Sequence, residues 1–281
     1  MHVKKVLNNN VVISEDSSGK EVVVMGKGLG FQLKTGMILD NNKVEKVFTL
    51  EESQNSELND NYFRLLKSIP IEILLCTENI IDLATSKLEN KLHPSIRISL
   101  ADHLYFAVER CVQGKKIENP MLWEIKSLYS NEFKVGLQAL DVIKNSSGIH
   151  FPEDEAGFIA LHFVNAQLND DMKNTLGITN MIRDIVNLIK YNLNLDINDD
   201  SISYQRLLTH LKFFAHRIMH SKEVNSDDDM LFQSVKSKYK TSFNCTQKIY
   251  LYIEENFSHT MTKEEMMFLT IHIERVRRQE D

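Results

Sequence analysis

The sequence predicts a multidomain fold in which a small antiparallel, β-barrel-like domain is followed by two all-α helical-bundle domains. Three observations carry this prediction. The first 50 of the 281 residues hold short β-branched runs separated by Asn, Asp and Gly, helical periodicity begins at Tyr62, and the helical part contains one pattern twice. Glycines concentrate in the first 36 residues and all four prolines come later, so the composition changes where the predicted fold changes.

Three apolar runs near the N-terminus are typical of short antiparallel strands. They cover residues 11–13, 22–24 and 44–48, and turn-forming residues bound each of them. Residues 51–61 are polar and almost free of apolar anchors, so we expect a linker there. Beyond it, apolar residues recur at spacings of three and four, which predicts amphipathic helices around Ile80, Leu83, Ala84 and Leu88 and around Ile182, Ile185, Val186 and Ile189.

The helical part repeats itself. Residues 126–133 match residues 236–243 at an offset of 110, and the same offset aligns Glu155, Phe158 and His162 with Glu265, Phe268 and His272. An offset of 107 aligns a second set: Leu100, His103, Leu104, Phe106 and Arg110 with Leu207, His210, Leu211, Phe213 and Arg217. Two similar cores need the same apolar residues, but that need does not extend to histidines. The four aligned histidines are therefore candidate functional residues.

Histidines in such a pattern have three possible uses. For metal binding, the sequence lacks an H-E-x-x-H or C-x-x-C motif. Only His216 and His220, four residues apart, could chelate a metal ion from one helix face. Acid–base catalysis needs a pocket and a second polar partner, which the sequence does not indicate. Phosphoryl acceptance fits a neutral imidazole, a good nucleophile at neutral pH, and would add about two negative charges to an interface.

Charged residues near the histidines have two interpretations each. Asp102 and the acids Glu153, Asp154 and Glu155 could orient imidazoles, or the last three could begin a helix after a proline. The aligned arginines of the repeat lie two helical turns past their histidines, a spacing that suits either a phosphate partner or a solvated face.

The composition is that of an ordinary globular protein, with 42% apolar and 26% charged residues, and the length suggests about two domains. No stretch reaches the ~20 apolar residues of a membrane span. Cys76, Cys111 and Cys245 lie far apart, which disfavours a disulfide scaffold or structural zinc site. We expect a cytoplasmic protein without membrane insertion, since the N-terminus also lacks a signal-peptide core.

The net charge of −6, taken alone, argues against a nucleic-acid partner. However, residues 1–50 hold seven lysines and five acids, so this part carries +2 and the remainder −8. The turns of the basic part are rich in Asn and Gly, including a G-x-G-x-G run at residues 26–30 that would let the backbone approach a ligand closely. Asn can read base edges, Lys can bind phosphates and an aromatic can stack on an unpaired base, although plain turns need the same residues.

The order of these parts resembles the BglG/LicT/SacY family of transcription antiterminators. Residues 1–10, 24–31 and 44–48 resemble its co-antiterminator RNA-binding domain. Residues 101–110 and 153–162 look like the signatures of its first regulatory domain, and residues 209–211 and 270–275 like those of its second.

This resemblance implies an RNA-binding domain at residues 1–55 and two regulation domains of the sugar phosphotransferase system (PTS) at residues 62–170 and 174–281. It implies a homodimer, not an enzyme, that binds a leader-mRNA antiterminator hairpin and needs no cofactor or metal. A sugar-specific PTS permease component would phosphorylate the first regulation domain, which generally inactivates the antiterminator. The phosphocarrier protein HPr would phosphorylate the second regulation domain, which generally activates the antiterminator. The implied phosphorylation sites are His103, His162, His210 and His272, and the implied RNA-binding residues are Lys5, Asn8, Asn10, Gly26, Lys27 and Phe31.

One position departs from the family pattern, because several relatives have Arg where Lys27 stands. Lysine contacts phosphate as a point charge and lacks the planar, bidentate recognition of arginine. Two alternatives remain: a DNA-binding regulator with the same phosphorylatable domains, which would need an N-terminal helix-turn-helix, and a histidine-dependent metabolic enzyme, which would need a deep pocket.

Overall fold

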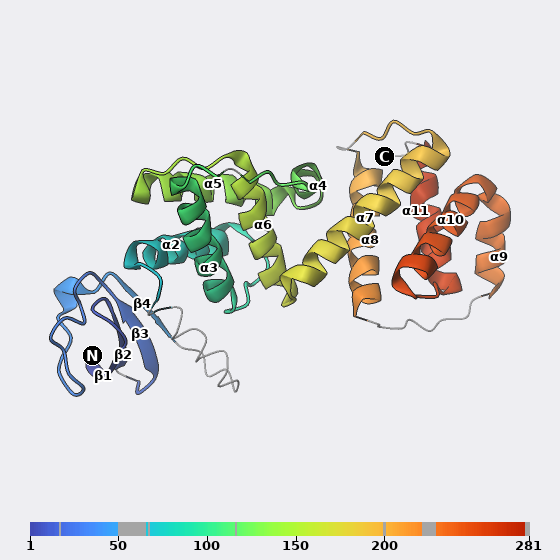
Figure 1. Cartoon of the computed structure of the whole chain (residues 1–281). Helices are drawn as coiled ribbons and strands as arrows, with labels where there is room; N and C mark the ends of the chain where they lie inside the picture. Colours follow the sequence, from blue (N-terminus) through green and yellow to red (C-terminus); the bar gives the residue numbers. More distant parts are fainter. Residues whose placement is uncertain are drawn as a thin grey trace. The chain divides into compact units, whose positions relative to one another are not determined.

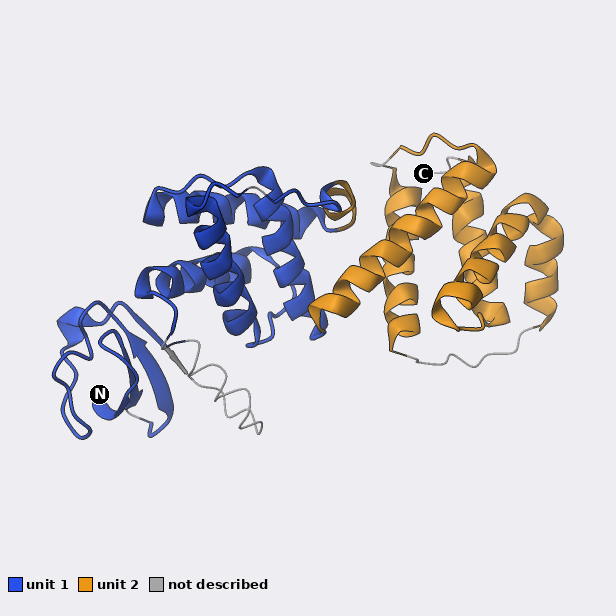
Figure 2. Ribbon diagram, viewed as in Figure 1, with its two compact units in different colours: residues 1–122, 129–170 blue, residues 123–128, 171–281 orange. Residues whose placement is uncertain are grey.

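The computed structural model describes residues 1–16, 18–49, 66, 68–115, 117–198, 201–220 and 229–278. An N-terminal sheet is followed by helices (Figure 1). The chain forms two compact units, residues 1–122 with 129–170 and residues 123–128 with 171–281 (Figure 2). The linker expected at residues 51–61 lies outside the described residues.

The N-terminal sheet is antiparallel, and its four strands follow one another in chain order: β1 (His2–Val6), β2 (Val11–Glu15), β3 (Glu21–Met25) and β4 (Lys46–Thr49). The three predicted apolar runs are confirmed as β2, β3 and β4. The sequence pattern missed β1, because a bulge between Val3 and Lys5 leaves Lys4 without a partner and breaks the two-residue alternation. An isolated antiparallel bridge also joins His2 to Ile38.

Alternation along the paired strands buries both faces of the sheet. On one face, Val12 and Val24 join a core with Leu29 and Leu39. The opposite face is filled by a second core that includes Val11, Ile13, Val23 and Met25 with Leu66, Ile71 and Leu74. The sheet thus leaves its edges and turns, rather than a face, for contacts with a partner.

The helices of the described residues recur in the same order in the two repeats. The first set comprises α2 (Ile71–Lys87), α3 (Ile96–Val112), α4 (Leu122–Leu128), α5 (Ser130–Ser147) and α6 (Glu153–Leu168). The second set comprises α7 (Met172–Leu193), α8 (Ile202–Met219), α9 (Asp229–Lys238), α10 (Lys240–Phe257) and α11 (Lys263–Arg278). The two helical patterns predicted from spacing lie in α2 and α7, and their central apolar residues are buried.

Helix packing within the first set brings α3 against α6, the pair that carries its histidines. Leu100 of α3 and Ile159 and Phe163 of α6 belong to one buried core with Ile80 of α2. In the second unit, Leu207 of α8 and Ile273 of α11 are likewise fully buried. Each histidine-bearing helix is therefore fixed by apolar contacts that flank its histidine. None of the described helices has the length and apolar composition needed to cross a bilayer.

The ends of α5 and α10 show that the repeat extends to helix capping. Gly148 and Ser258, equivalent positions, both take the left-handed conformation at the C-cap, with φ of 73° and 53°. This conformation is strained for a serine but not for a glycine. We expect S258G to raise the free energy of unfolding of the chain by about 0.5–1 kcal/mol. The matched exchange G148S should lower it by a similar amount in denaturant titrations; changes of the same sign in the two variants would contradict this explanation.

Candidate functional site

The first predicted histidine pair is brought together between α3 and α6. The ring centroids of His103 and His162 lie 4.9 Å apart, although the residues are separated by 59 positions in the chain. His162 Nδ1 lies 3.3 Å from the hydroxyl of Ser99, one helical turn before His103. The two histidines therefore form one cluster, as their equivalents in the second repeat also do.

A carboxylate and an arginine complete this first cluster. Glu155 Oε2 lies 3.0 Å from His103 Nε2, and Glu155 Oε1 accepts a hydrogen bond from Arg110 Nη2 at 3.3 Å. Among the acids considered from the sequence, Glu155 lies against a histidine. Asp102 is exposed, and Asp154 accepts a hydrogen bond from the backbone N–H of Asn119. All three acids at residues 153–155 also lie in the first turn of α6, so both interpretations of this acidic run apply.

The second predicted pair lies between α8 and α11. The rings of His210 and His272 are closer than those of the first pair, with centroids 3.9 Å apart. His210 is exposed, whereas His272 is only 7% exposed and its Nδ1 is buried without a hydrogen-bond partner among the described residues. The pair borders a cavity of about 240 Å³ that is also lined by Leu211, Phe214, Arg217, Glu264, Glu265, Phe268 and Leu269.

Glu265, the equivalent of Glu155, has different partners from its counterpart. Its oxygens accept from Arg217 Nη2 at 3.4 Å and from the backbone N–H of Thr262 at 3.0 Å, and His259 Nε2 lies 3.5 Å away. The Glu265 N–H in turn donates to the Thr262 hydroxyl, which makes a capping box at the start of α11. The arginine contact recurs in both repeats, but the histidine contact moves from the α3 histidine to His259.

Burial keeps one histidine of each pair neutral. It lowers the pKa of His162 to about 3, with a smaller contribution from the charge of His103. It lowers the pKa of His272 to about 4, aided by the charges of His210, Arg275 and Arg206. A neutral imidazole retains a nucleophilic lone pair, so this environment permits phosphoryl acceptance at neutral pH.

Some members of the clusters were not found from the sequence. Ser99 and His259 contact His162 and Glu265, but neither recurs in register between the repeats, so the repeat gave no signal for them. His216 and His220, considered for metal chelation, stack with centroids 4.2 Å apart. Nδ1 of His220 is engaged with the backbone carbonyl of His216 at 2.8 Å, which removes one possible ligand atom from that pair.

The two predicted RNA-binding asparagines build the turns of the β module. The side-chain oxygen of Asn8 accepts from the backbone N–H groups of Asn10 and Val11, and its amide donates to the carbonyl of Leu66. The side-chain oxygen of Asn10 accepts from the N–H of Gly28 at 2.9 Å, joining the β1–β2 turn to the glycine loop. Their contribution to any ligand surface is therefore first to fix the loop that carries other residues.

The glycine run has a structural role that its sequence alone did not indicate. A Cβ at Gly26 would lie 1.8 Å from the carbonyl oxygen of Lys43, and one at Gly30 would lie 2.3 Å from that of Asn8. These two glycines approach the protein's own backbone, so close approach to a ligand is not needed to explain them. Gly28, with φ of +65°, forms the turn between them.

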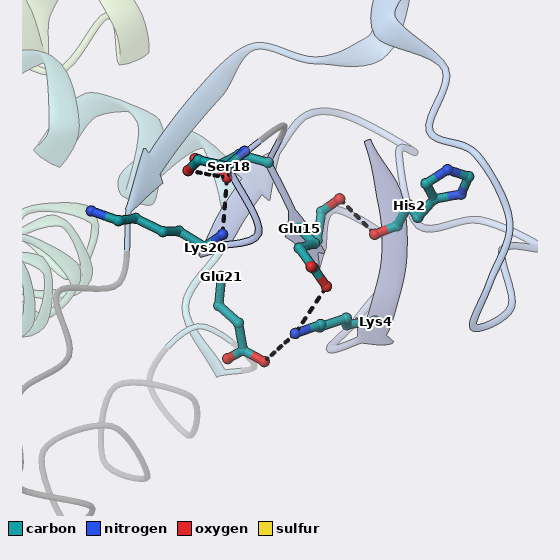
Figure 3. A network of polar contacts seen from close by, with 8 residues as sticks. His2, Lys4, Glu15, Ser18, Lys20 and Glu21 are labelled. Atoms are coloured by element: carbon teal, nitrogen blue, oxygen red, sulfur yellow. Dashed lines mark hydrogen bonds and ion pairs between the residues drawn. The ribbon is translucent and has the colours of Figure 1, made fainter.

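Three further predicted residues lie at the surface of the module. Phe31 is 60% exposed, which is unusual for a phenylalanine and leaves its ring available for stacking. Lys5 on β1 is exposed, and Lys27 Nζ lies 3.4 Å from Glu72 of α2 in an exposed ion pair. Elsewhere in the module, Lys4 lies 3.1 Å from Glu15 and 3.3 Å from Glu21 (Figure 3). Lys4 and Lys27 are thus both paired with acids at the surface of the protein.

Comparison with known proteins gives the same division of the chain. The model of the CAT RNA binding domain matches residues 1–57, and that of the PRD domain matches residues 78–166 and again residues 183–276, which confirms the repeat. The transcription antiterminator LicT of Bacillus subtilis (strain 168) is 46% identical over 279 residues, covering 99% of this chain and all of LicT. The beta-glucoside operon antiterminator of Dickeya chrysanthemi is 47% identical over 277 residues, covering 99% and 97%.

A solved structure is also similar to the first part of the chain. The crystal structure of GlcT CAT-PRDI has 35% sequence identity and a TM-score of 0.50, and it covers 59% of this chain and 97% of that one. The arrangement of a strand-rich module followed by a helical repeat is therefore shared with an experimentally determined fold.

Proposed function

Since the chain belongs to the family of transcription antiterminators that join a CAT RNA-binding domain to PRD domains, we propose that it binds a leader-mRNA hairpin as a homodimer and prevents an overlapping terminator from forming. It is a regulatory RNA-binding protein rather than an enzyme, and its PRD domains make that regulation dependent on the PTS. We assign the RNA-binding domain to residues 1–55 and the regulation domains to residues 62–170 and 174–281. The proposed partners in regulation are HPr and a sugar-specific permease component.

The observation that carries the regulatory proposal is the recurrence of a histidine pair in both helical repeats. Each pair combines a histidine that desolvation keeps neutral with a second ring about 4–5 Å away and a nearby Arg–Glu contact. A phosphoryl group on either pair would add about two negative charges beside a buried carboxylate. The local charge balance would change strongly enough to alter packing or association, as a regulatory switch requires.

The proposed RNA surface is the glycine loop with its flanking residues Lys5, Asn8, Asn10, Gly26, Lys27 and Phe31. The two asparagines and Gly26 hold the loop, the lysines supply positive charge, and the exposed ring of Phe31 supplies a stacking surface. A monomeric module of this size covers little of a hairpin, and pairing two modules would raise the effective affinity.

Replacing Phe31 with alanine should weaken binding of the full chain to its leader hairpin by about 5- to 150-fold, because base–aromatic stacking is worth about 1–3 kcal/mol per base. Gel-shift titrations at fixed salt would measure the loss. Y191A is the control, since Tyr191 of α7 is an exposed aromatic residue outside the β module. Equal affinities of F31A and the parent would remove Phe31 from the proposed surface.

Regulation is tested at the second histidine pair. We expect H210A/H272A to abolish activation by phosphorylated HPr in a reporter with the leader hairpin and terminator, while RNA binding by the purified chain persists. H216A is the control, because His216 lies on the same helix as His210 but outside the cavity. Undiminished activation of the double variant would refute the proposed role of this pair.

A further inference from the structure

The glutamates of the two Glu–Arg pairs contact different histidines, and this difference affects how the histidine ring is oriented. Glu155 contacts His103 directly, at 3.0 Å, while its other oxygen faces Arg110. In the second repeat, Glu265 contacts His259 and Thr262 instead, and no carboxylate of the described residues contacts His210. Only one of the equivalent α3 and α8 histidines is therefore oriented by an acid.

The contact between Glu155 and His103 fixes which nitrogen carries the proton. Burial alone would raise the pKa of Glu155, but its hydrogen bonds and charge interactions with His103 and Arg110 outweigh burial and keep that pKa below the usual range. An ionised carboxylate only accepts hydrogen bonds, so His103 Nε2 must donate. In the neutral ring the lone pair then lies on Nδ1.

From this geometry, and resting on the proposed function, we propose that Glu155 is a positioning residue that makes Nδ1 of His103 the phosphoryl-accepting atom. The carboxylate sits at the far nitrogen, where it stabilises the positive charge that develops on the ring as the new bond forms. Arg110 holds Glu155 in place through its second oxygen and keeps it ionised. His210 lacks this constraint, so the proposal is confined to the first pair.

The transfer step balances without a further reactant. The N–P bond of a phosphohistidine on the donor protein breaks as a bond forms between phosphorus and Nδ1 of His103. The electron pair of the broken bond returns to the donor imidazole, which is left neutral because its other nitrogen is protonated. The Nε2 proton of His103 stays in the hydrogen bond to Glu155 throughout.

The first test reads the tautomer before any phosphorylation. In the full chain labelled with ¹⁵N-histidine, at about pH 8 where ordinary histidines are neutral, long-range ¹H–¹⁵N spectra should show His103, assigned by its loss in H103Q, in the Nε2–H form. E155Q should remove this bias, whereas the matched variant E265Q should leave it unchanged. If E155Q does not fold, E155D provides a second comparison, because it keeps the charge but shortens the side chain that reaches His103 Nε2 and should weaken the bias. A protonated Nδ1 in the parent would overturn the proposal.

The second test reads the phosphorylated atom and needs no partner protein. Phosphoramidate, a small chemical phosphoryl donor, would be reacted with the labelled full chain and with H103Q. We expect at least about a tenfold excess of Nδ1- over Nε2-phosphohistidine at His103, as one charge-assisted hydrogen bond would give, and a mixture in E155Q. Predominant Nε2 product would overturn the proposal while leaving PTS regulation intact. Failure of HPr and permease proteins to phosphorylate the chain would instead count against the proposed function alone.

Discussion

Replacing Gly26 with alanine is expected to unfold the β module and abolish RNA binding. The added Cβ would lie 1.8 Å from the carbonyl oxygen of Lys43 and 2.9 Å from its carbonyl carbon, both of them backbone atoms that cannot rotate away. The turn at residues 41–43, a 3₁₀ helix, would have to move, and with it the register of β4 on β3. We expect a loss of at least about 3 kcal/mol from the free energy of unfolding of the module.

The control for this substitution lies two residues along the same loop. A Cβ at Gly28 meets nothing within 4 Å, so G28A should cost only the strain of a positive φ, about 1 kcal/mol. Denaturant unfolding followed at probes in the sheet would compare the two variants. Equal stability of G26A and G28A would show that the loop relaxes more easily than this packing indicates.

Lowering the pH from about 6.5 to about 4 should destabilise the second unit by about 3 kcal/mol through His272 alone. The folded pKa is about 4, whereas an unfolded histidine titrates near 6.5. A histidine whose pKa is lowered by folding stabilises the fold fully above its unfolded pKa and loses that contribution as the pH falls toward its folded pKa. Between these values the slope approaches about 1.4 kcal/mol per pH unit. His162, with a folded pKa of about 3, should act in the same direction in the first unit.

A comparison of variants isolates the histidine contribution from that of other groups. Hydrogen bonds, chiefly from Arg277, lower the pKa of Glu274 to about 2. Its contribution to the free energy of unfolding is lost only as the pH falls below the pKa of an unfolded glutamate, so it adds little slope above pH 5. H272Q should therefore flatten the dependence of unfolding free energy on pH in that upper range. H150Q, which changes an exposed histidine, should leave the slope unaltered. A parent protein with no acid dependence between pH 6.5 and 5 would contradict a buried neutral His272.

Strand and helix patterns were predictable where periodicity was intact. The runs that became β2, β3 and β4 alternate or lie fully buried, and the helices at α2 and α7 carry regular apolar spacing. The edge strand β1 was not predicted, because Lys4 occupies a bulge and two adjacent lysines interrupt the pattern. Local irregularity of this kind is set by the strand partner and by the turn that follows, neither of which a single run of residues reveals.

The histidine pairs could be predicted because the repeat placed four histidines in register, and the structure brings each pair within contact distance. What could not be predicted is the environment of each ring. The aligned residues Glu155 and Glu265 share a Phe three residues later and a His seven residues later, yet they have different partners, since side-chain direction depends on the opposing helix and on the loop that holds His259. Similarly, the glycines at positions 26 and 30 could be assigned to backbone crowding only once the neighbouring loops were placed.

The capping box at Thr262 and Glu265 links helix fraying to the state of the second histidine pair. One carboxylate holds the backbone N–H that starts α11 and also the guanidinium of Arg217, which borders the cavity next to both rings. A phosphoryl group that drew Arg217 away would leave that carboxylate with fewer partners and loosen the first turn of the helix. Amide hydrogen exchange at residues 263–266 would then report whether the second histidine pair, more than one turn further along α11, is phosphorylated.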